Sequence, residues 1–235
     1  MRAVGQVVSV NVGQPQPRQR RLGDGATVRD YATAIHKRPV AGPVAVRRLG
    51  LAGDAQGDTV NHGGADKAVH IQFRANLQWL SALAGRPVLP GEIGENLTVT
   101  ASEAGADQPA EGDFCVGDVL AVGDAILQVT QPRIPCYKQA EQTGVADVVE
   151  RIVASGRTGL HLRVLAEGAV RTNDMVYLVR RTHPDWPLPR LHLLVHTPGT
   201  PGERAAAGAI PELSAELRRR FARALESRPD GGRRE

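Results

Sequence analysis

The chain has 235 residues, of which 41% are hydrophobic and 23% charged, which suits one large domain or a medium domain with a small appendage. Its two cysteines, Cys115 and Cys136, are too few for a disulfide framework and form no CxxC pair for zinc. The first residues contain too short an apolar run for a signal peptide, and no later stretch is long enough for a membrane span. We therefore expect a cytoplasmic protein without a membrane partner.

The formal net charge of +4 is concentrated near the C-terminal end. From Glu216 onward there are seven arginines and four acidic residues, so this part contributes 7 − 4 = +3. Aromatic residues make up only 3% of the chain, too few for a platform on which single-stranded bases stack. We do not expect nucleic acid as a partner, and the arginine-rich end is either a partner-binding surface or a solvated helix face.

The first part of the chain predicts strands separated by long loops. Valines between positions 4 and 12 predict an opening strand, and the polar, proline-bearing run over 13–25 is predicted to be an exposed loop. Turn formers and valines alternate in residues 38–46, which predicts short strands entering a sheet. Residues 50–69 contain five glycines and few apolar residues, and we predict a loop there.

The next segment changes from strand to helix and back. Apolar residues alternate in 69–73, which predicts a half-buried strand, and helical spacing follows in 77–84. Asn76 is the predicted N-cap of this helix, and Gly85 its end. A short strand is predicted for 97–100.

A β-hairpin and a second helix come next. Two apolar stretches, 119–122 and 125–129, flank Gly123-Asp124, a two-residue connection typical of hairpins. Apolar residues fall on one face of a predicted helix over 145–155, and strands are predicted for 160–164 and 175–179. Because the helices are inserted among non-adjacent strands, we predict a mainly β fold with a closed or nearly closed barrel.

The character of the chain changes after residue 183. Three prolines between 184 and 189 indicate a linker, and helices are predicted after it over 191–196, 203–210 and 214–227. In the last helix, Leu217, Phe221 and Leu225 repeat every four residues behind Ser214, a predicted N-cap. We therefore predict a barrel domain, 1–183, and a small C-terminal helical domain, 184–235.

The stretch Gln131-Pro132-Arg133-Ile134-Pro135-Cys136-Tyr137-Lys138 places one thiol between two prolines and two cations, directly after a predicted strand. The prolines hold the backbone extended, so we expect the sulfur on a stiff loop. Nearby positive charge lowers the pKa of a thiol, so Arg133 and Lys138 would favour the reactive thiolate if the fold brings them close. The alternative is that Cys136 is a small apolar filler.

The loop that contains His62, Gly63, Gly64 and Lys67 combines glycines, an imidazole and an ammonium group, which together suit an anion. The same pattern is also found in ordinary flexible loops. There is no Gly-Lys-Ser/Thr, so the loop is not a Walker A motif.

Four further polar residues have two interpretations each. Asp54 and Asp58 either hold the loop of His62 through hydrogen bonds to its amides or are solvated turn residues. Glu95 and Asn96 are either ligand contacts or turn stabilisers.

Two other kinds of site have weaker support. His192 and His196 have the spacing of a metal-ligand pair on a helix, but the glutamate of a metalloprotease helix is missing, and we do not expect a metal there. Cys136 with a distant histidine would form a thiol hydrolase pair, although no flanking signature supports it.

Four motifs follow one another along the chain: Gly53-Asp54…Asp58…His62-Gly63-Gly64-Ala65-Asp66-Lys67-Ala68-Val69, Gly94-Glu95-Asn96-Leu97-Thr98, Gly117-Asp118 and Gln131 to Lys138. Taken in this order, they closely resemble the motifs of bacterial MOSC-domain proteins of the YiiM type. The ordered set is more specific than any one motif, and the helical tail resembles the small three-helix domain that follows the barrel in these proteins.

The resemblance implies a MOSC-type β-barrel that binds the molybdenum cofactor, a pterin carrying a dithiolene and a phosphate (Mo-molybdopterin). It also implies reduction of N-hydroxylated compounds, such as hydroxylaminopurines and amidoximes, a detoxification that requires no pyridoxal phosphate. Cys136 is then the molybdenum ligand, since a soft thiolate suits such a metal. The residues expected to hold the phosphate and pterin are His62, Gly63, Gly64, Lys67, Asn96, Arg133 and Lys138, with His62 also the candidate proton donor.

The expected partners are a small N-hydroxylated substrate and a separate NAD(P)H-dependent flavin reductase as electron donor, and a homodimer is left open. A non-enzymatic alternative uses the same loop: the protein would carry the cofactor, or carry sulfur as a persulfide on Cys136.

Overall fold

The structure is a computed structural model that describes residues 1–21, 27–57, 63–103 and 105–226. Its strands are β1 (Arg2–Val12), β2 (Gln16–Arg21), β3 (Val28–Thr33), β4 (Arg38–Pro39), β5 (Val44–Arg47), β6 (Gly50–Leu51), β7 (Val69–Phe73), β8 (Leu97–Thr100), β9 (Val119–Val122), β10 (Ala125–Pro132), β11 (Leu160–Ala166), β12 (Gly168–Val170) and β13 (Met175–Arg180). Its helices are η1 (Ala65–Lys67), α1 (Arg74–Ala84), η2 (Glu111–Asp113), α2 (Lys138–Thr143), α3 (Val148–Ser155), α4 (Leu188–His196), α5 (Pro201–Gly208) and α6 (Ala215–Glu226).

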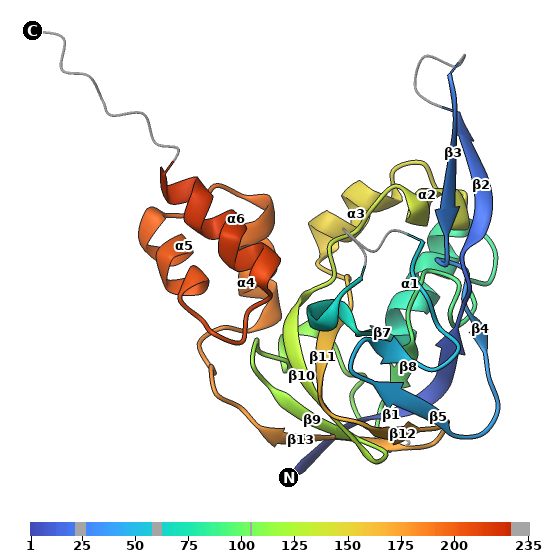
Figure 1. Ribbon diagram of the computed structural model, residues 1–235, viewed down its shortest axis with the longest axis horizontal. Coiled ribbons are helices and arrows are strands. Elements are labelled where there is room, and N and C mark those ends of the chain that lie inside the picture. The colour runs from blue at the N-terminus through green and yellow to red at the C-terminus, as the bar shows by residue number, and fades with distance from the viewer. Residues whose placement is uncertain (22–26, 58–62, 104, 227–235) are drawn as a thin grey trace, which may run out of the picture.

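A closed barrel forms the centre of the molecule (Figure 1). Its strands follow the order β13-β9-β10-β11-β7-β8-β1, and β1 pairs again with β13 to close the ring. Neighbouring strands are antiparallel except β7 and β8, which are parallel and are joined through α1. The prediction of a mainly β barrel with inserted helices and a helical C-terminal part is confirmed.

The barrel interior is filled by β-branched and aliphatic side chains, as the alternating pattern predicts. Val7 and Val10 of β1, Leu127 of β10 and Leu162 of β11 have no exposed surface. Outside the barrel wall, α1 and α3 share a second apolar cluster. These contacts fix the ends of the strands, from which the loops of the candidate site extend.

The predicted loop over 13–25 is wrong, because residues 16–21 form β2, which pairs with β3 along its whole length. The sequence of β2 is polar and contains Pro17, so it lacks the apolar alternation on which the strand predictions depend. Its position explains this composition: the hairpin of β2 and β3 projects beyond the body of the protein, next to α2 (Figure 1).

Two helix boundaries also differ from the prediction. Helix α1 begins at Arg74 with Phe73 as N-cap, and Asn76 is a buried residue whose amide donates to Gln72 and Glu111. The helix predicted over 145–155 begins only at Val148. A separate short helix, α2, starts directly after the Cys136 loop.

The helices α4, α5 and α6 gather on one side of the barrel (Figure 1). They share an apolar cluster that also includes Val116, from the segment that leads into β9, so the helical part packs against this segment. The predicted cap of α6 is confirmed, since Ser214 Oγ accepts a hydrogen bond from the Leu217 amide at 3.2 Å. The division into two domains after residue 183 stays a prediction. Within the described ranges no helix has the length and apolarity to cross a membrane.

Candidate functional site

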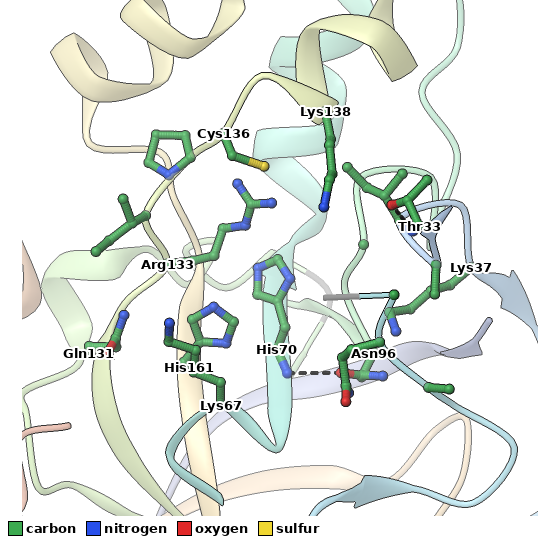
Figure 2. A pocket seen from close by; sticks show the side chains of 18 of the residues that line it. Thr33, Lys37, Lys67, His70, Asn96, Gln131, Arg133, Cys136, Lys138 and His161 are labelled. Carbon is green, nitrogen blue, oxygen red and sulfur yellow. Dashed lines mark hydrogen bonds between the residues drawn. The ribbon is translucent and has the colours of Figure 1, made fainter. Parts of the chain in front are cut away.

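A cavity of about 230 Å³ lies where the Cys136 loop, the start of α2 and the residues after β3 meet (Figure 2). Its lining mixes apolar residues with polar ones, four of them cationic, and it comes from segments far apart in the sequence. The residues are Thr33, Ala34, Ile35, Lys37, Ala55, Gln56, Gly57, Lys67, His70, Gly94, Asn96, Gln131, Arg133, Ile134, Pro135, Cys136, Lys138, His161 and Glu216.

Cys136 lies on the loop between β10 and α2, as the two prolines predict. Its thiol is free and half-buried. Figure 2 shows the sulfur directed toward the Arg133 guanidinium and the Lys138 ammonium, so the fold brings the thiol and both cations of the motif to one cavity. The apolar-filler alternative fits Cys115 instead, whose side chain is buried and whose thiol pKa is raised by burial.

Arg133 is only 7% exposed although it carries a permanent charge. Its Nη1 has no hydrogen-bond partner in the part of the chain that the structure describes, and neither has Gln131 Oε1. Buried polar atoms in proteins are almost always paired, and an unpaired guanidinium nitrogen is especially unfavourable. An anion bound in this cavity would accept the hydrogen bond that Arg133 Nη1 lacks.

Lys138 opens helix α2 and is 8% exposed. Its ammonium lies 5.9 Å from the ring centre of Tyr31 and 6.0 Å from that of Tyr137, which are distances of weak cation–π contact. The charge is therefore held at the cavity by aromatic faces.

Lys67 is the last residue of η1, and its amide bonds to the carbonyl of Gly64. Gly64 has φ +93°, which a side chain would strain, so a glycine suits this turn. The Lys67 ammonium forms an ion pair with Glu216 of α6. Gly63 lies next to this turn, outside the cavity lining. His62 and Asp58 are outside the described residues.

Asn96 lines the cavity with both ends of its amide engaged. Its Oδ1 accepts from the His70 amide at 3.1 Å, and its Nδ2 donates to Asp54 Oδ2 at 2.9 Å. Asp54 also pairs with Lys37 and accepts from the Gly13 amide at 2.8 Å. Neither interpretation of Asp54 fits the described residues: its side chain is only 1% exposed, and the backbone amide that it accepts from follows β1 and does not belong to the loop of His62. Asn96 holds the wall of the cavity.

His70 and His161 stand opposite each other on β7 and β11, with ring centres 5.2 Å apart. Burial of His70, with Arg133 and Lys37 nearby, lowers its pKa to about 3. The imidazole is therefore neutral at physiological pH. Neither histidine is among the predicted site residues, although a histidine within an alternating apolar stretch is a signal for such a position.

Lys37 and Glu216 also line the cavity, and no sequence motif predicted either of them.

Glu95 is a turn stabiliser and not part of the cavity lining: its Oε1 accepts from the Gly91 amide at 2.7 Å. His192, which has the spacing of a metal-ligand pair with His196, uses its Nε2 to donate a hydrogen bond to the carbonyl of Val153 at 2.8 Å. Among the described residues no group of three His, Cys, Asp or Glu side chains is arranged to hold a metal ion.

The chain matches a family model and several relatives. The model described as "MOSC domain" matches residues 58–177. The protein YflK of Bacillus subtilis is 38% identical over 175 residues, which are 74% of this chain and 73% of YflK. A protein of Gibberella moniliformis named "Reductase" is 31% identical over 176 residues, and the match covers 73% of this chain but only 30% of that longer protein.

A solved structure extends the likeness to nearly the whole fold. The crystal structure of YiiM from Geobacillus stearothermophilus superimposes with a TM-score of 0.74 at 31% sequence identity. The alignment covers 94% of this chain and 99% of that chain, so it includes the helical part as well as the barrel.

Proposed function

The chain belongs to the MOSC-domain family and is of the YiiM type, and from this premise we propose that it is a molybdenum-cofactor-dependent reductase of N-hydroxylated compounds. MOSC domains are associated with the molybdenum cofactor, and one relative is named a reductase. The observation that carries the proposal is the meeting of the Cys136 thiol with the buried Arg133, whose Nη1 lacks a partner among the described residues.

The side chains present fit this cofactor. Cys136 supplies a soft sulfur ligand of the kind that molybdenum accepts. Arg133, Lys138 and Lys67 supply the positive charge that a phosphate needs, and the unpaired Nη1 is a donor available to it. Gly63 and Gly64 are outside the cavity lining; Gly64, with its positive φ, forms the turn that brings Lys67 to the cavity. Asn96 would keep the wall in place, since its amide is already engaged.

When bound, the cofactor supplies the two-electron reduction that converts an N–OH group and two protons into N–H and water. The protein's own residues would bind the cofactor, orient the substrate and supply protons. Arg133 and Lys138 would hold anionic groups, and the neutral His70 would add no further positive charge beneath them. His62 remains our candidate proton donor, and the electrons would come from an NAD(P)H-dependent flavin reductase.

The test compares the two cysteines. Wild type, Cys136→Ala and Cys115→Ala are produced in a host that synthesises the cofactor, and the molybdenum per protein is measured by elemental analysis. We expect metal in the wild type and in Cys115→Ala, because Cys115 is buried outside the cavity. We expect none in Cys136→Ala.

Turnover of an N-hydroxylated substrate with an electron donor is then measured on the loaded wild type. Equal molybdenum in wild type and Cys136→Ala would remove the proposed ligand. Metal-free protein with a persulfide on Cys136 would support the carrier instead, and ester or amide cleavage that alkylation abolishes without metal would support the thiol hydrolase.

A further inference from the structure

A second hollow adjoins the Cys136 cavity. It is a groove of about 450 Å³ at the base of the β2–β3 hairpin, and it shares Thr33 and Ile35 with the cavity. Figure 1 shows the hairpin standing beside α2, the helix that follows Cys136. The remaining lining residues are Arg18, Gln19, Arg20, Tyr31, Glu141 and Gln142.

One face of the hairpin carries three arginines. In the register of β2 and β3, Arg18 stands opposite Tyr31, and Arg20 stands opposite Arg29. Residues directly opposite each other in an antiparallel pair lie on the same face, and like charges in such positions repel. This face therefore concentrates positive charge in a way that destabilises the isolated hairpin.

Only part of this charge is balanced. Arg20 lies 3.6 Å from Glu141, which also accepts a hydrogen bond from the Tyr31 hydroxyl. Arg18 and Arg29 are exposed, and neither forms an ion pair with another described residue. Two guanidinium groups thus remain available to a ligand: that of Arg18 in the groove lining, and that of Arg29, which lies on the same face of the hairpin just outside that lining.

The groove has a fixed position relative to Cys136. Tyr31 packs edge-on against Tyr137 with ring centres 6.1 Å apart, and the Arg20 guanidinium lies 3.9 Å from the Tyr137 ring centre. Tyr137 follows Cys136 directly in the chain. The aromatic contacts therefore tie the cationic face to the loop that bears the thiol.

We propose that this groove binds the phosphate group of a phosphorylated, nucleotide-sized substrate whose other end enters the Cys136 cavity. Guanidinium groups bind phosphate through paired hydrogen bonds, and 450 Å³ is within the range of small-molecule sites. As a statement about the substrate, the inference rests on the proposed function. The binding of a phosphate monoester to the groove is testable without it.

The experiment uses a matched pair of probes, AMP and adenosine, which differ only in the phosphate. Each is titrated into the full chain by isothermal calorimetry, with inorganic phosphate as a third probe. We expect AMP to bind about tenfold or more tightly than adenosine, as hydrogen bonds between charged groups allow. In Arg18→Gln/Arg29→Gln the preference should disappear, whereas Arg2→Gln/Arg180→Gln, which removes two exposed arginines elsewhere, should retain it.

Each other result overturns the proposal. Equal affinity for AMP and adenosine, or no AMP binding at millimolar concentration, excludes a phosphate anchor. A preference that survives Arg18→Gln/Arg29→Gln locates the anion elsewhere, and Arg133 in the first cavity is then the candidate. Inorganic phosphate binding as tightly as AMP shows a site for a free anion and no substrate anchor.

A kinetic measurement is then made with protein that contains the cofactor. For an N-hydroxylated nucleotide, Arg18→Gln/Arg29→Gln should raise KM and leave kcat unchanged, because the arginines bind substrate and transition state equally. An unchanged KM overturns the substrate role. If no N-hydroxylated compound is turned over at all, the proposed function fails while the calorimetric result still decides the groove.

Discussion

Lys67 and Glu216 are 149 positions apart in the chain, and their side chains form an ion pair at the rim of the cavity. The neighbouring Asp66 accepts a hydrogen bond from the Ala215 amide at 2.8 Å. Two consecutive residues of η1 thus hold the first turn of α6. The helical part of the chain therefore supplies a carboxylate to a site otherwise built from the barrel and its loops.

We expect Glu216→Gln to strengthen the binding of anions to the cavity, because the Lys67 ammonium loses its negative partner. The expected gain is a few-fold, in line with about 0.2–1 kcal/mol for a partly exposed pair. Binding of pyrophosphate is measured by calorimetry at low salt. Glu150→Gln, at an exposed position on α3, is the control, and an equal gain in that variant would show a general charge effect.

Gly159→Ala should disturb the floor of the cavity. Gly159 has φ +72°, and a Cβ there would collide with the Ile71 carbonyl oxygen and lie 2.9 Å from His70 Nε2. We expect the free energy of unfolding to fall by more than about 2 kcal/mol in urea denaturation.

Gly156→Ala is a close control for this variant. Gly156 has nearly the same backbone conformation, φ +69°, but a Cβ there would find its nearest neighbour, in His192, only at 3.9 Å. It should lose only about 1 kcal/mol, the strain of a left-handed residue with a side chain. If both variants lose the same free energy of unfolding, the structure accommodates the new contact with Ile71 and His70 at no extra cost, and the prediction is wrong.

Glu95 should make the protein less stable as the pH rises through neutrality. Burial raises the pKa of its carboxyl to about 7, well above the ordinary value of 4.5. The folded state thus holds this proton more tightly than the unfolded chain does. The stabilisation is fully present below about pH 4.5 and is lost as the pH rises through 7.

The measurement is urea denaturation of wild type and Glu95→Gln between pH 4 and 8. Gln retains an oxygen for the Gly91 amide and cannot ionise. Relative to this variant, the wild type should lose stability over that range, by an amount of the order of a few kcal/mol. A constant difference between the two proteins would contradict the buried carboxyl.

His70 should make the protein less stable as the pH falls, which is the opposite of the effect of Glu95. Its pKa of about 3 lies below the ordinary 6.5, so the unfolded chain binds this proton more readily than the folded one. Stability from this group is complete above pH 6.5 and is lost as the pH falls toward 3. NMR titration of the ring should show no protonation between pH 7 and 4, and a midpoint near 6 would refute the buried, neutral imidazole.

The barrel strands were predictable because their apolar alternation is strong. The hairpin of β2 and β3 was not, since most of its residues are exposed and its polar sequence follows no period. Asparagine is a common helix cap, which is why Asn76 was predicted to be one. In the structure its side-chain amide instead donates to Gln72 and to Glu111, and the position of Glu111 depends on the tertiary structure.

For the candidate site, the motif Gln131 to Lys138 correctly predicted which residues meet Cys136 in one cavity. Arg133 and Lys138 line the same cavity, as do Lys67 and Asn96. Their roles in binding stay predictions. Glu216 was not predictable, because its position depends on how α6 docks on η1, and no local pattern encodes that contact.

The pairing of β1 with β13 has a consequence for synthesis of the protein. The ring closes through contacts such as that between Ala3 and Tyr177, so β1, which is synthesised before the other barrel strands, waits for β13, which is synthesised after them. Until then β1 has an unpaired edge that other nascent chains are able to join. We therefore expect barrel closure to be slow and post-translational, and yields to improve when translation is slowed or chaperones are abundant.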